Sequence, residues 1–133
     1  MEMEESVAVV RRLVDRINCR DLAGLVELMT DDHEFIDATG AVHAGRERMR
    51  EGWKEYFSSF PDYRIDIEEA IGEGRVVAIF GWASGTFKNG APKASSWRVP
   101  ASWKGIVRDG RVFQWRVYCD VEPMLRSMGI NRF

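Results

Sequence analysis

Cysteine is scarce in this chain, which has only Cys19 and Cys119 among its 133 residues. Two cysteines so far apart exclude the disulfide-rich scaffolds of small secreted domains. They also lack the short spacings at which cysteine and histidine bind zinc, and the two histidines add no such spacing. We therefore expect two free thiols, a reducing compartment and no metal site.

Long apolar runs and basic runs are also missing. No stretch approaches the ~20 apolar residues of a membrane span. The first residues, 1–5, are acidic, whereas a secretory leader begins with basic residues followed by an apolar run. The net charge of −2 comes from 19 basic and 21 acidic residues, and no basic run is interleaved with aromatics. We expect a cytoplasmic protein with neither nucleic acid nor membrane as a partner.

What remains is ordinary globular composition, with 45% hydrophobic and 30% charged residues. A chain of this length buries enough surface for one core, so we expect a single domain over residues 1–133. Its first half reads as helical and its second half as strands. No linker, repeat or low-complexity tract separates the two halves.

Three helices are expected in the first half. Apolar residues recur at helical spacing over residues 10–17 and predict the first helix. Asp21 is expected to cap a second helix, whose apolar stripe runs to Met29 and which residues 30–32 interrupt. A third helix is expected over residues 46–60, and its aromatic stripe indicates that it lies along a sheet.

A strand-like run over residues 33–37 lies between the second and third helices, and from Tyr63 onward the pattern alternates with a period of two. The further expected strands begin at Tyr63 and span residues 75–86, 93–107 and 112–119, with turns at 72–74, 88–90 and 109–110. A short final helix is expected after Asp120. Glycines at 81, 85 and 105 indicate bulges or bends in the long strands. This order predicts an α+β fold in which a cone-shaped, curved antiparallel sheet packs on three helices and leaves a hollow end.

Asp37 is the most informative single residue. It ends the run His33–Asp37, and residues two apart on a strand share a face, so Asp37 should face the same way as Phe35 and His33. A carboxylate buried beside Phe35 would have a raised pKa, which suits an acid or base near neutral pH. The alternative is a solvated turn over residues 37–40, in which the aspartate binds nearby backbone N–H groups.

The order of the elements, together with several short segments, resembles the nuclear-transport-factor-2-like superfamily in its SnoaL-like and ketosteroid-isomerase-like branches. The matching segments are residues 18–25, 30–32, 45–49, 108–112 and 118–121, with Leu125 and residues 128–129. The resemblance implies a cone with an apolar pocket, which binds a small apolar or aromatic molecule, and usually a homodimer formed through the sheet. Its members include isomerases, polyketide cyclases, epoxide hydrolases and non-catalytic proteins, so the fold by itself leaves function open.

The resemblance assigns roles to individual residues. Asp37 falls where ketosteroid-isomerase-like enzymes place the general base that moves a proton next to a carbonyl. Leu13 stands where those enzymes have a tyrosine that donates to the oxyanion, and Trp103 stands where they have a protonated aspartate. Losing such donors removes a large electrostatic contribution to catalysis. Trp103 is either a replacement donor, through its indole N–H, or a core aromatic.

Two further residues are candidate helpers of Asp37. His43 lies in the segment 40–45, which borders the pocket mouth in the family, and it either reaches a ligand or is a solvated loop residue. Asp120 lies where SnoaL-like cyclases use an acidic residue, and its alternative role is to cap the last helix. His33 is expected to be a structural or rim histidine. No cofactor is expected.

The remaining candidates would form the wall of the pocket. They are Leu13, Phe35, Trp53, Phe57, Trp97, Trp103, Trp115 and Cys119. Strand alternation places Trp115 on one face with Phe113 and Cys119. Aromatic residues fill cores and dimer interfaces equally well. The sequence thus supports two hypotheses: cofactor-free proton transfer on a small apolar or polycyclic molecule with Asp37 as base, or a non-catalytic binding, dimerisation or adaptor module.

Overall fold

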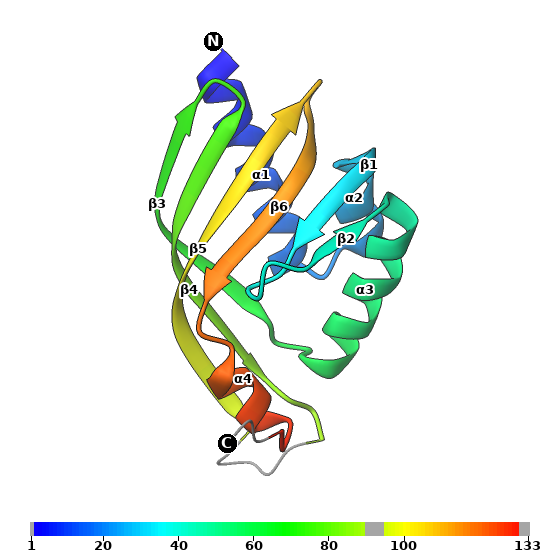
Figure 1. Ribbon diagram of the computed structural model, residues 1–133, viewed down its shortest axis with the longest axis vertical. Coiled ribbons are helices and arrows are strands. Elements are labelled where there is room, and N and C mark those ends of the chain that lie inside the picture. Colours follow the sequence, from blue (N-terminus) through cyan, green and yellow to red (C-terminus); the bar gives the residue numbers. More distant parts are fainter. Residues whose placement is uncertain (1, 90–94, 131–133) are drawn as a thin grey trace.

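Six strands form one curved sheet in the computed structural model of this protein, which describes residues 2–89 and 95–130 (Figure 1). The helices are α1 (Glu2–Asn18), α2 (Leu22–Glu27), α3 (Arg46–Ser59) and α4 (Glu122–Ser127). The strands are β1 (Met29–Ile36), β2 (Val42–Ala44), β3 (Arg64–Glu73), β4 (Val76–Thr86), β5 (Ser96–Arg108) and β6 (Arg111–Cys119). The expected α+β class is confirmed. The expected turn at 88–90 and the expected strand start at Lys93 fall partly outside the described residues.

The strand order is β2-β1-β6-β5-β4-β3. Strands β3 to β6 form the expected antiparallel meander. The prediction of a purely antiparallel sheet is wrong, because β1 pairs with β6 in parallel. Side-chain alternation is the same in parallel and antiparallel strands, so the sequence pattern carries no information about this pairing.

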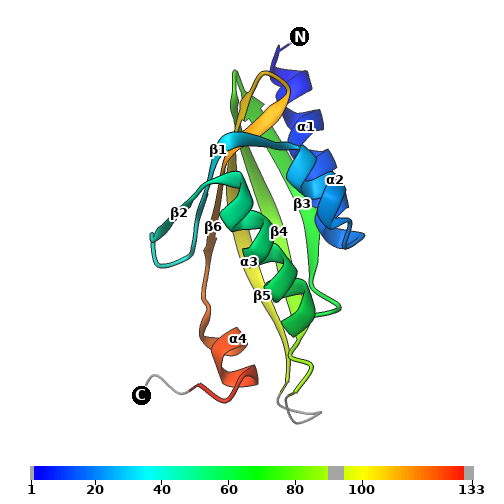
Figure 2. The same ribbon diagram turned by 90° about the vertical axis from the view of Figure 1, so that its right-hand side faces the viewer.

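Helices α1, α2 and α3 lie against one face of the sheet, and α4 lies at its far end (Figures 1 and 2). The predicted apolar stripe of α1 is buried in the core, including Val10, Leu13 and Ile17. On α3, Met49 and Trp53 are buried as expected. The alternation predicted for β5 is also confirmed, since Trp97 and Trp103 lie on the buried face.

Two local predictions were wrong. The second helix ends at Glu27, and Met29 begins β1, so residues 30–32 belong to a strand. The backbone N–H of Val112 in β6 donates to the Leu28 carbonyl, which draws this segment into the sheet. His43 lies in β2 rather than in a loop, and it is paired with Phe35. In both places the chain forms a strand because its backbone bonds to a neighbouring strand, and the periodicity of a single segment does not show such bonds.

Bulges shape the strands. The register of β3 against β4 shifts between Ile67 and Glu69, opposite the expected bend at Gly81. A second register shift, between β5 and β6, changes the face of Phe113. That ring lies 4.5 Å from the guanidinium carbon of Arg108 and lines no part of the pocket described below, so the predicted shared face with Trp115 is wrong.

The outer face of the sheet carries its own aromatic residues. Phe80, Ser102 and Tyr118 are neighbours across β4, β5 and β6, and both rings are exposed. Trp82 is also on this face, where the Arg98 guanidinium lies 4.0 Å from its ring centroid. One tryptophan of the strand half therefore faces outward. The homodimer through this face stays a prediction.

His33 is a structural histidine, as expected, and is 1% exposed. Its Nδ1–H donates to the Val112 carbonyl over 2.7 Å, and Nε2 has no partner within the described part of the chain. Burial lowers the pKa of His33 below 6.5, and the bond to Val112 offsets only part of that effect.

This burial predicts a pH-dependent stability. Unfolded His33 takes up a proton near pH 6.5, whereas the folded protein does so only at lower pH, so the unfolded state binds more protons in between. The free energy of unfolding should be at its full value above about pH 6.5 and fall as the pH drops below it. Urea unfolding between pH 5 and 7.5 measures this slope. A His33→Asn variant that kept the wild-type slope would contradict the assignment.

Candidate functional site

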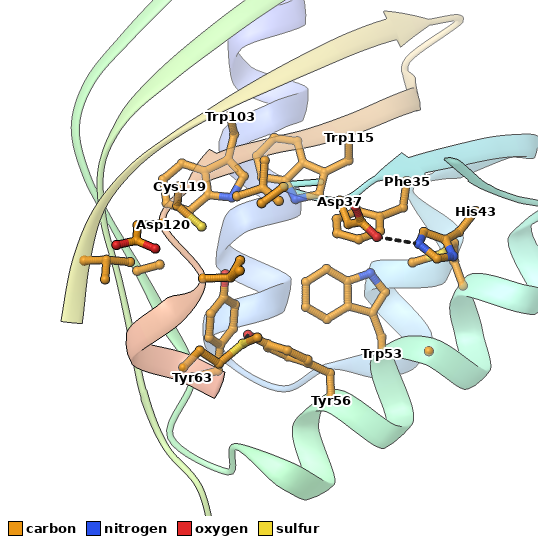
Figure 3. Close-up of a pocket in the computed structure, with 18 of the residues that line it drawn as sticks. Phe35, Asp37, His43, Trp53, Tyr56, Tyr63, Trp103, Trp115, Cys119 and Asp120 are labelled. Atoms are coloured by element: carbon orange, nitrogen blue, oxygen red, sulfur yellow. Dashed lines mark hydrogen bonds and ion pairs between the residues drawn. The ribbon is translucent and has the colours of Figure 1, made fainter. Parts of the chain in front are cut away.

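A cavity of about 310 Å³ lies between the inner face of the sheet and helices α3 and α4 (Figure 3). Its lining is mostly aromatic and aliphatic. The lining residues are Phe35, Asp37, Ala38, His43, Arg48, Met49, Gly52, Trp53, Tyr56, Tyr63, Ala83, Trp97, Val99, Trp103, Trp115, Val117, Cys119, Asp120, Val121 and Met124. A cavity of this size and character suits a small apolar molecule.

Most of the predicted site residues meet in this cavity. The three candidates for chemistry, Asp37, His43 and Asp120, all line it. So do the predicted wall residues Phe35, Trp53, Trp97, Trp103, Trp115 and Cys119.

Two predicted wall residues do not line the cavity. Leu13 is 1% exposed and packs in the core on α1, because the apolar stripe of that helix faces the middle of the sheet rather than its open end. Phe57 packs against Trp53, with ring centroids 5.4 Å apart, and is absent from the lining. The apolar side chains of α3 cover more of the helix surface than the part that faces the cavity. Helical spacing therefore predicted Phe57 as a wall residue, although its ring lies outside the lining.

Eleven lining residues were not predicted as site residues, and the largest or most polar of them are Arg48, Tyr56, Tyr63 and Met124. The two tyrosines were visible in the apolar patterns of α3 and of the segment before β3, but those patterns do not distinguish the core from a pocket. Met124 enters through α4, whose position is a tertiary feature. Arg48 lies within the segment 45–49 that resembles the family, but no pattern in the sequence marked it as a site residue.

The Asp37 carboxylate both anchors a turn, as one of its two predicted alternatives requires, and lines the cavity. Its Oδ1 accepts hydrogen bonds from the backbone N–H groups of Thr39 and Ala41, at 2.9 and 3.1 Å, and from the Thr39 hydroxyl at 2.6 Å. Its Oδ2 accepts from His43 Nε2–H at 2.9 Å. His43 Nδ1 in turn lies 3.4 Å from the Arg48 guanidinium. Oδ1 is therefore saturated, while Oδ2 keeps a lone pair for a ligand.

The predicted raised pKa of Asp37 is wrong. Partial burial by itself would raise it, but the hydrogen bonds from His43, Thr39 and Ala41 outweigh burial and lower the pKa from 3.8 to about 2. The side chain keeps 30% exposure and that of His43 keeps 33%, so the pair lies at the mouth of the cavity. Local sequence showed the neighbouring Phe35 but not the donors that converge on the carboxylate.

Asp120 lies on the opposite side of the cavity from Asp37 (Figure 3). Its Oδ1 accepts from the Glu122 backbone N–H at 3.0 Å, which stabilises the turn that leads into α4. The predicted capping role is wrong in detail, because the N-cap of α4 is Val121, one residue later. Burial raises the pKa of the neighbouring Cys119, and the Asp120 charge adds to that shift. Cys119 is therefore a neutral thiol in the wall of the cavity.

Aromatic rings form the walls between these two ends. Trp103 and Trp115 stack with an interplanar angle of 10° and a centroid distance of 6.2 Å. Across the cavity, Tyr56 and Tyr63 meet edge to face at 4.9 Å. The Tyr56 hydroxyl donates to the Met124 sulfur at 3.4 Å, which ties α3 to α4. A flat ligand fits between such walls.

A curved sheet over three helices, with an aromatic cavity at one end, is the cone-shaped α+β architecture. The chain belongs to the SnoaL-like domain family, whose model matches residues 10–116. Among curated proteins, none matches the sequence significantly.

Solved structures share the fold. An LEH-like epoxide hydrolase from M. tuberculosis has a TM-score of 0.81 at 16% identity, covering 96% of this chain and 91% of its own. A protein assigned to the SnoaL-like polyketide cyclases, from Jannaschia sp. CCS1, has a TM-score of 0.81 at 22% identity, covering 95% and 94%. A ketosteroid-isomerase-like protein from Catenulispora acidiphila, in complex with trimethylamine, has a TM-score of 0.80 at 20% identity, covering 92% and 93%. At these identities the likeness extends to the fold.

Within residues 2–89 and 95–130, no group of three or more His, Cys, Asp or Glu side chains is placed to hold a metal ion. No helix there has the length and apolar content needed to cross a bilayer.

Proposed function

We propose that this protein binds a small, flat, mostly apolar molecule in the cavity and transfers a proton on it without a cofactor, with Asp37 as the proton acceptor. The observation that carries the proposal is the position of Asp37. It is an ionised carboxylate at the rim of an aromatic cavity, with one oxygen held by the turn and the other shared with His43.

The proposed reaction moves one proton between the substrate and the Asp37 carboxylate and needs no other reactant. Asp37 Oδ2 takes a proton from a C–H bond next to a carbonyl, and the bonding electrons move onto the carbonyl oxygen as an enolate forms. The resulting carboxylic acid then returns the proton to another carbon of the same molecule. His43 Nε2–H holds the Asp37 carboxylate in place during both transfers.

The low pKa of Asp37 restricts the substrate. A carboxylate with a pKa of about 2 is a weak base, so it suits only C–H or O–H groups that are already acidic. The same observation favours a second candidate function, in which the pocket binds its ligand without turnover and the Asp37–His43 pair serves as a polar anchor.

Ligand binding is the common element of both functions and is the first to test. Thermal melting should be recorded against steroids, phenolics, polyketide-like quinones, terpene epoxides and acyl compounds. A ligand at ~100 times its Kd adds about 2.7 kcal/mol of stability, which for this size of domain raises Tm by several degrees.

A pair of variants distinguishes the cavity from the rest of the surface. Ala83 on β4 lines the cavity, so Ala83→Phe should place a ring in it and abolish the shift. Ala78 on the same strand lies on the other face, so Ala78→Phe should leave the shift intact. A folded wild-type protein that responded to no class of compound would contradict the proposal.

A further inference from the structure

A second hollow, of about 250 Å³, shares no residue with the aromatic cavity. It is formed by α1, by the segment around α2 and by the turn that joins β5 to β6. Its lining residues are Arg12, Arg16, Gly24, Glu27, Leu28, Gly110 and Arg111. Because arginine is the commonest residue of this lining, we call it the arginine hollow.

Elements far apart in the sequence bring these arginines together. Arg12 and Arg16 are four residues apart on α1, so both lie on the same side of that helix. Arg111 is the first residue of β6, and the next residue, Val112, donates its backbone N–H to the Leu28 carbonyl at 2.7 Å. That bond holds the start of β6 beside the end of α2, and α2 lies against α1 (Figure 2). Guanidinium groups from α1 and from β6 therefore border one space.

The carboxylates nearby neutralise this charge only in part. Asp31 and Asp32, which follow α2, form ion pairs with Arg46 and Arg108, and neither of these arginines lines the hollow. Glu27 does line the hollow, but it forms no ion pair with any residue in 2–89 or 95–130. The hollow therefore keeps a net positive charge.

Two of the three arginines have no partner of their own. Arg16 forms an ion pair with Asp21 at 3.6 Å. Arg12 and Arg111 form neither an ion pair nor a side-chain hydrogen bond within the described part of the chain. Like charges four residues apart on a helix repel each other, and a third guanidinium group nearby adds to the repulsion. An anion bound among the three groups would turn this repulsion into attraction.

Phosphate is the anion chemistry that suits these groups best. A guanidinium group presents its N–H donors in a planar fork, which bonds two oxygens of the same anion. A phosphate group carries nearly two negative charges at neutral pH and three acceptor oxygens, so it can bond to guanidinium groups that approach from different sides. Leu28 is the one aliphatic side chain of the lining, so the hollow offers little to an apolar ligand.

We infer that the arginine hollow binds a phosphate group, held by Arg12, Arg16 and Arg111. The hollow and the aromatic cavity have separate linings, so this inference stands or falls independently of the proposed function. Glu27 repels the bound anion and limits its affinity.

The test is a titration of the protein with inorganic phosphate at about pH 7.5 and low salt, followed by calorimetry and by NMR of the arginine Nε–H resonances. Wild-type protein should bind a single phosphate with a Kd of about 1 mM, since two charge-assisted hydrogen bonds supply roughly that affinity. Binding should weaken as the salt concentration rises. Chloride at the same ionic strength should give no saturable change.

Single substitutions locate the bound phosphate. Arg12→Gln and Arg111→Gln should each weaken binding by about tenfold, because each removes a charge-assisted contact. Arg11→Gln is the matched control: it removes the same charge from the adjacent residue of α1, which does not line the hollow, and it should change the Kd by less than about twofold. Glu27→Gln should tighten binding by about threefold. All four residues are exposed, so each variant should melt within about two degrees of wild type.

Three results would overturn the inference. The first is the absence of a saturable response of wild-type protein to phosphate. The second is an equal loss of affinity in Arg11→Gln and Arg12→Gln, which would show that phosphate is attracted by general surface charge. The third is weaker binding in Glu27→Gln, which would place the anion outside the hollow.

Glycerol 3-phosphate distinguishes the two sources of such a group. Tighter binding than that of inorganic phosphate, lost in Arg12→Gln, would assign the hollow to a phosphorylated small molecule. Equal affinity, with the same loss in that variant, would assign it to free phosphate.

Discussion

Replacing Asp37 with asparagine is expected to lower turnover by about 10² to 10⁴-fold once a substrate is identified, because that is the usual contribution of a positioned general base. The amide oxygen of the introduced side chain cannot take up the substrate proton. It can still accept from the backbone N–H groups of Thr39 and Ala41, so the turn is expected to persist. Steady-state kinetics of the purified variant measures the effect.

The Asp37→Asn substitution should also change how the free energy of unfolding depends on pH. The pKa of Asp37 is lowered from 3.8 to about 2, so the wild-type carboxylate contributes stability that is fully present above about pH 4 and is lost as the pH falls toward 2. The asparagine variant should lack this acid-dependent loss. At neutral pH its Tm should lie within a few degrees of wild type, because the group is partly exposed and its charge is screened.

Asp62→Asn is the matched control for both measurements. Asp62 is a loop carboxylate that also accepts from a backbone N–H and a threonine hydroxyl, both of Thr86, at 2.7 Å each. It does not line the cavity, so its replacement should leave turnover unchanged. Undiminished turnover in Asp37→Asn would remove Asp37 from the mechanism and favour a role as a polar anchor for a bound ligand.

Gly81→Ala is expected to destabilise the protein by about 3 kcal/mol or more, an effect in the upper range for a single methyl group. A Cβ at Gly81 would lie 1.8 Å from the Asp66 carbonyl oxygen and 2.9 Å from its carbon. These are backbone atoms at the β3 bulge, so no side-chain rotation relieves the overlap. Either the bulge or the β3–β4 pairing must shift. Urea unfolding should show the loss of free energy, and thermal unfolding should show a Tm lower by roughly 10 °C or more.

Gly52→Ala is the control for adding a methyl group to a glycine. Gly52 lies within α3, and its Cβ would meet only the Met49 terminal methyl group, at 3.8 Å. Alanine there should stabilise the helix by about 0.5–1 kcal/mol. If Gly81→Ala unfolded at the same urea concentration as wild type, the close approach of the β3 bulge to β4 would be wrong.

Local patterns in the sequence predicted most of the secondary structure. The helical spacing of Val10, Leu13 and Ile17 and the alternation through Trp97 and Trp103 follow from burial on one face, which each element shows by itself. The turn at Asp109 and Gly110 was equally local, since both residues adopt positive φ, 52° and 76°, as a tight hairpin turn requires.

The candidate site was predicted in part, since Asp37, His43 and Asp120 were named from the sequence and all line the cavity. The sequence by itself determined which residues are apolar or charged and, within each element, most of the faces on which they lie. Tertiary structure alone decided that β1 pairs in parallel with β6, that Leu13 packs in the core, and that Tyr63 reaches the cavity. It also decided the pKa of Asp37, because the strength of an acid depends on the burial and hydrogen bonds that the folded chain brings to it. Periodicity reports the face of one strand or helix, whereas a pocket and its electrostatics arise where several elements meet.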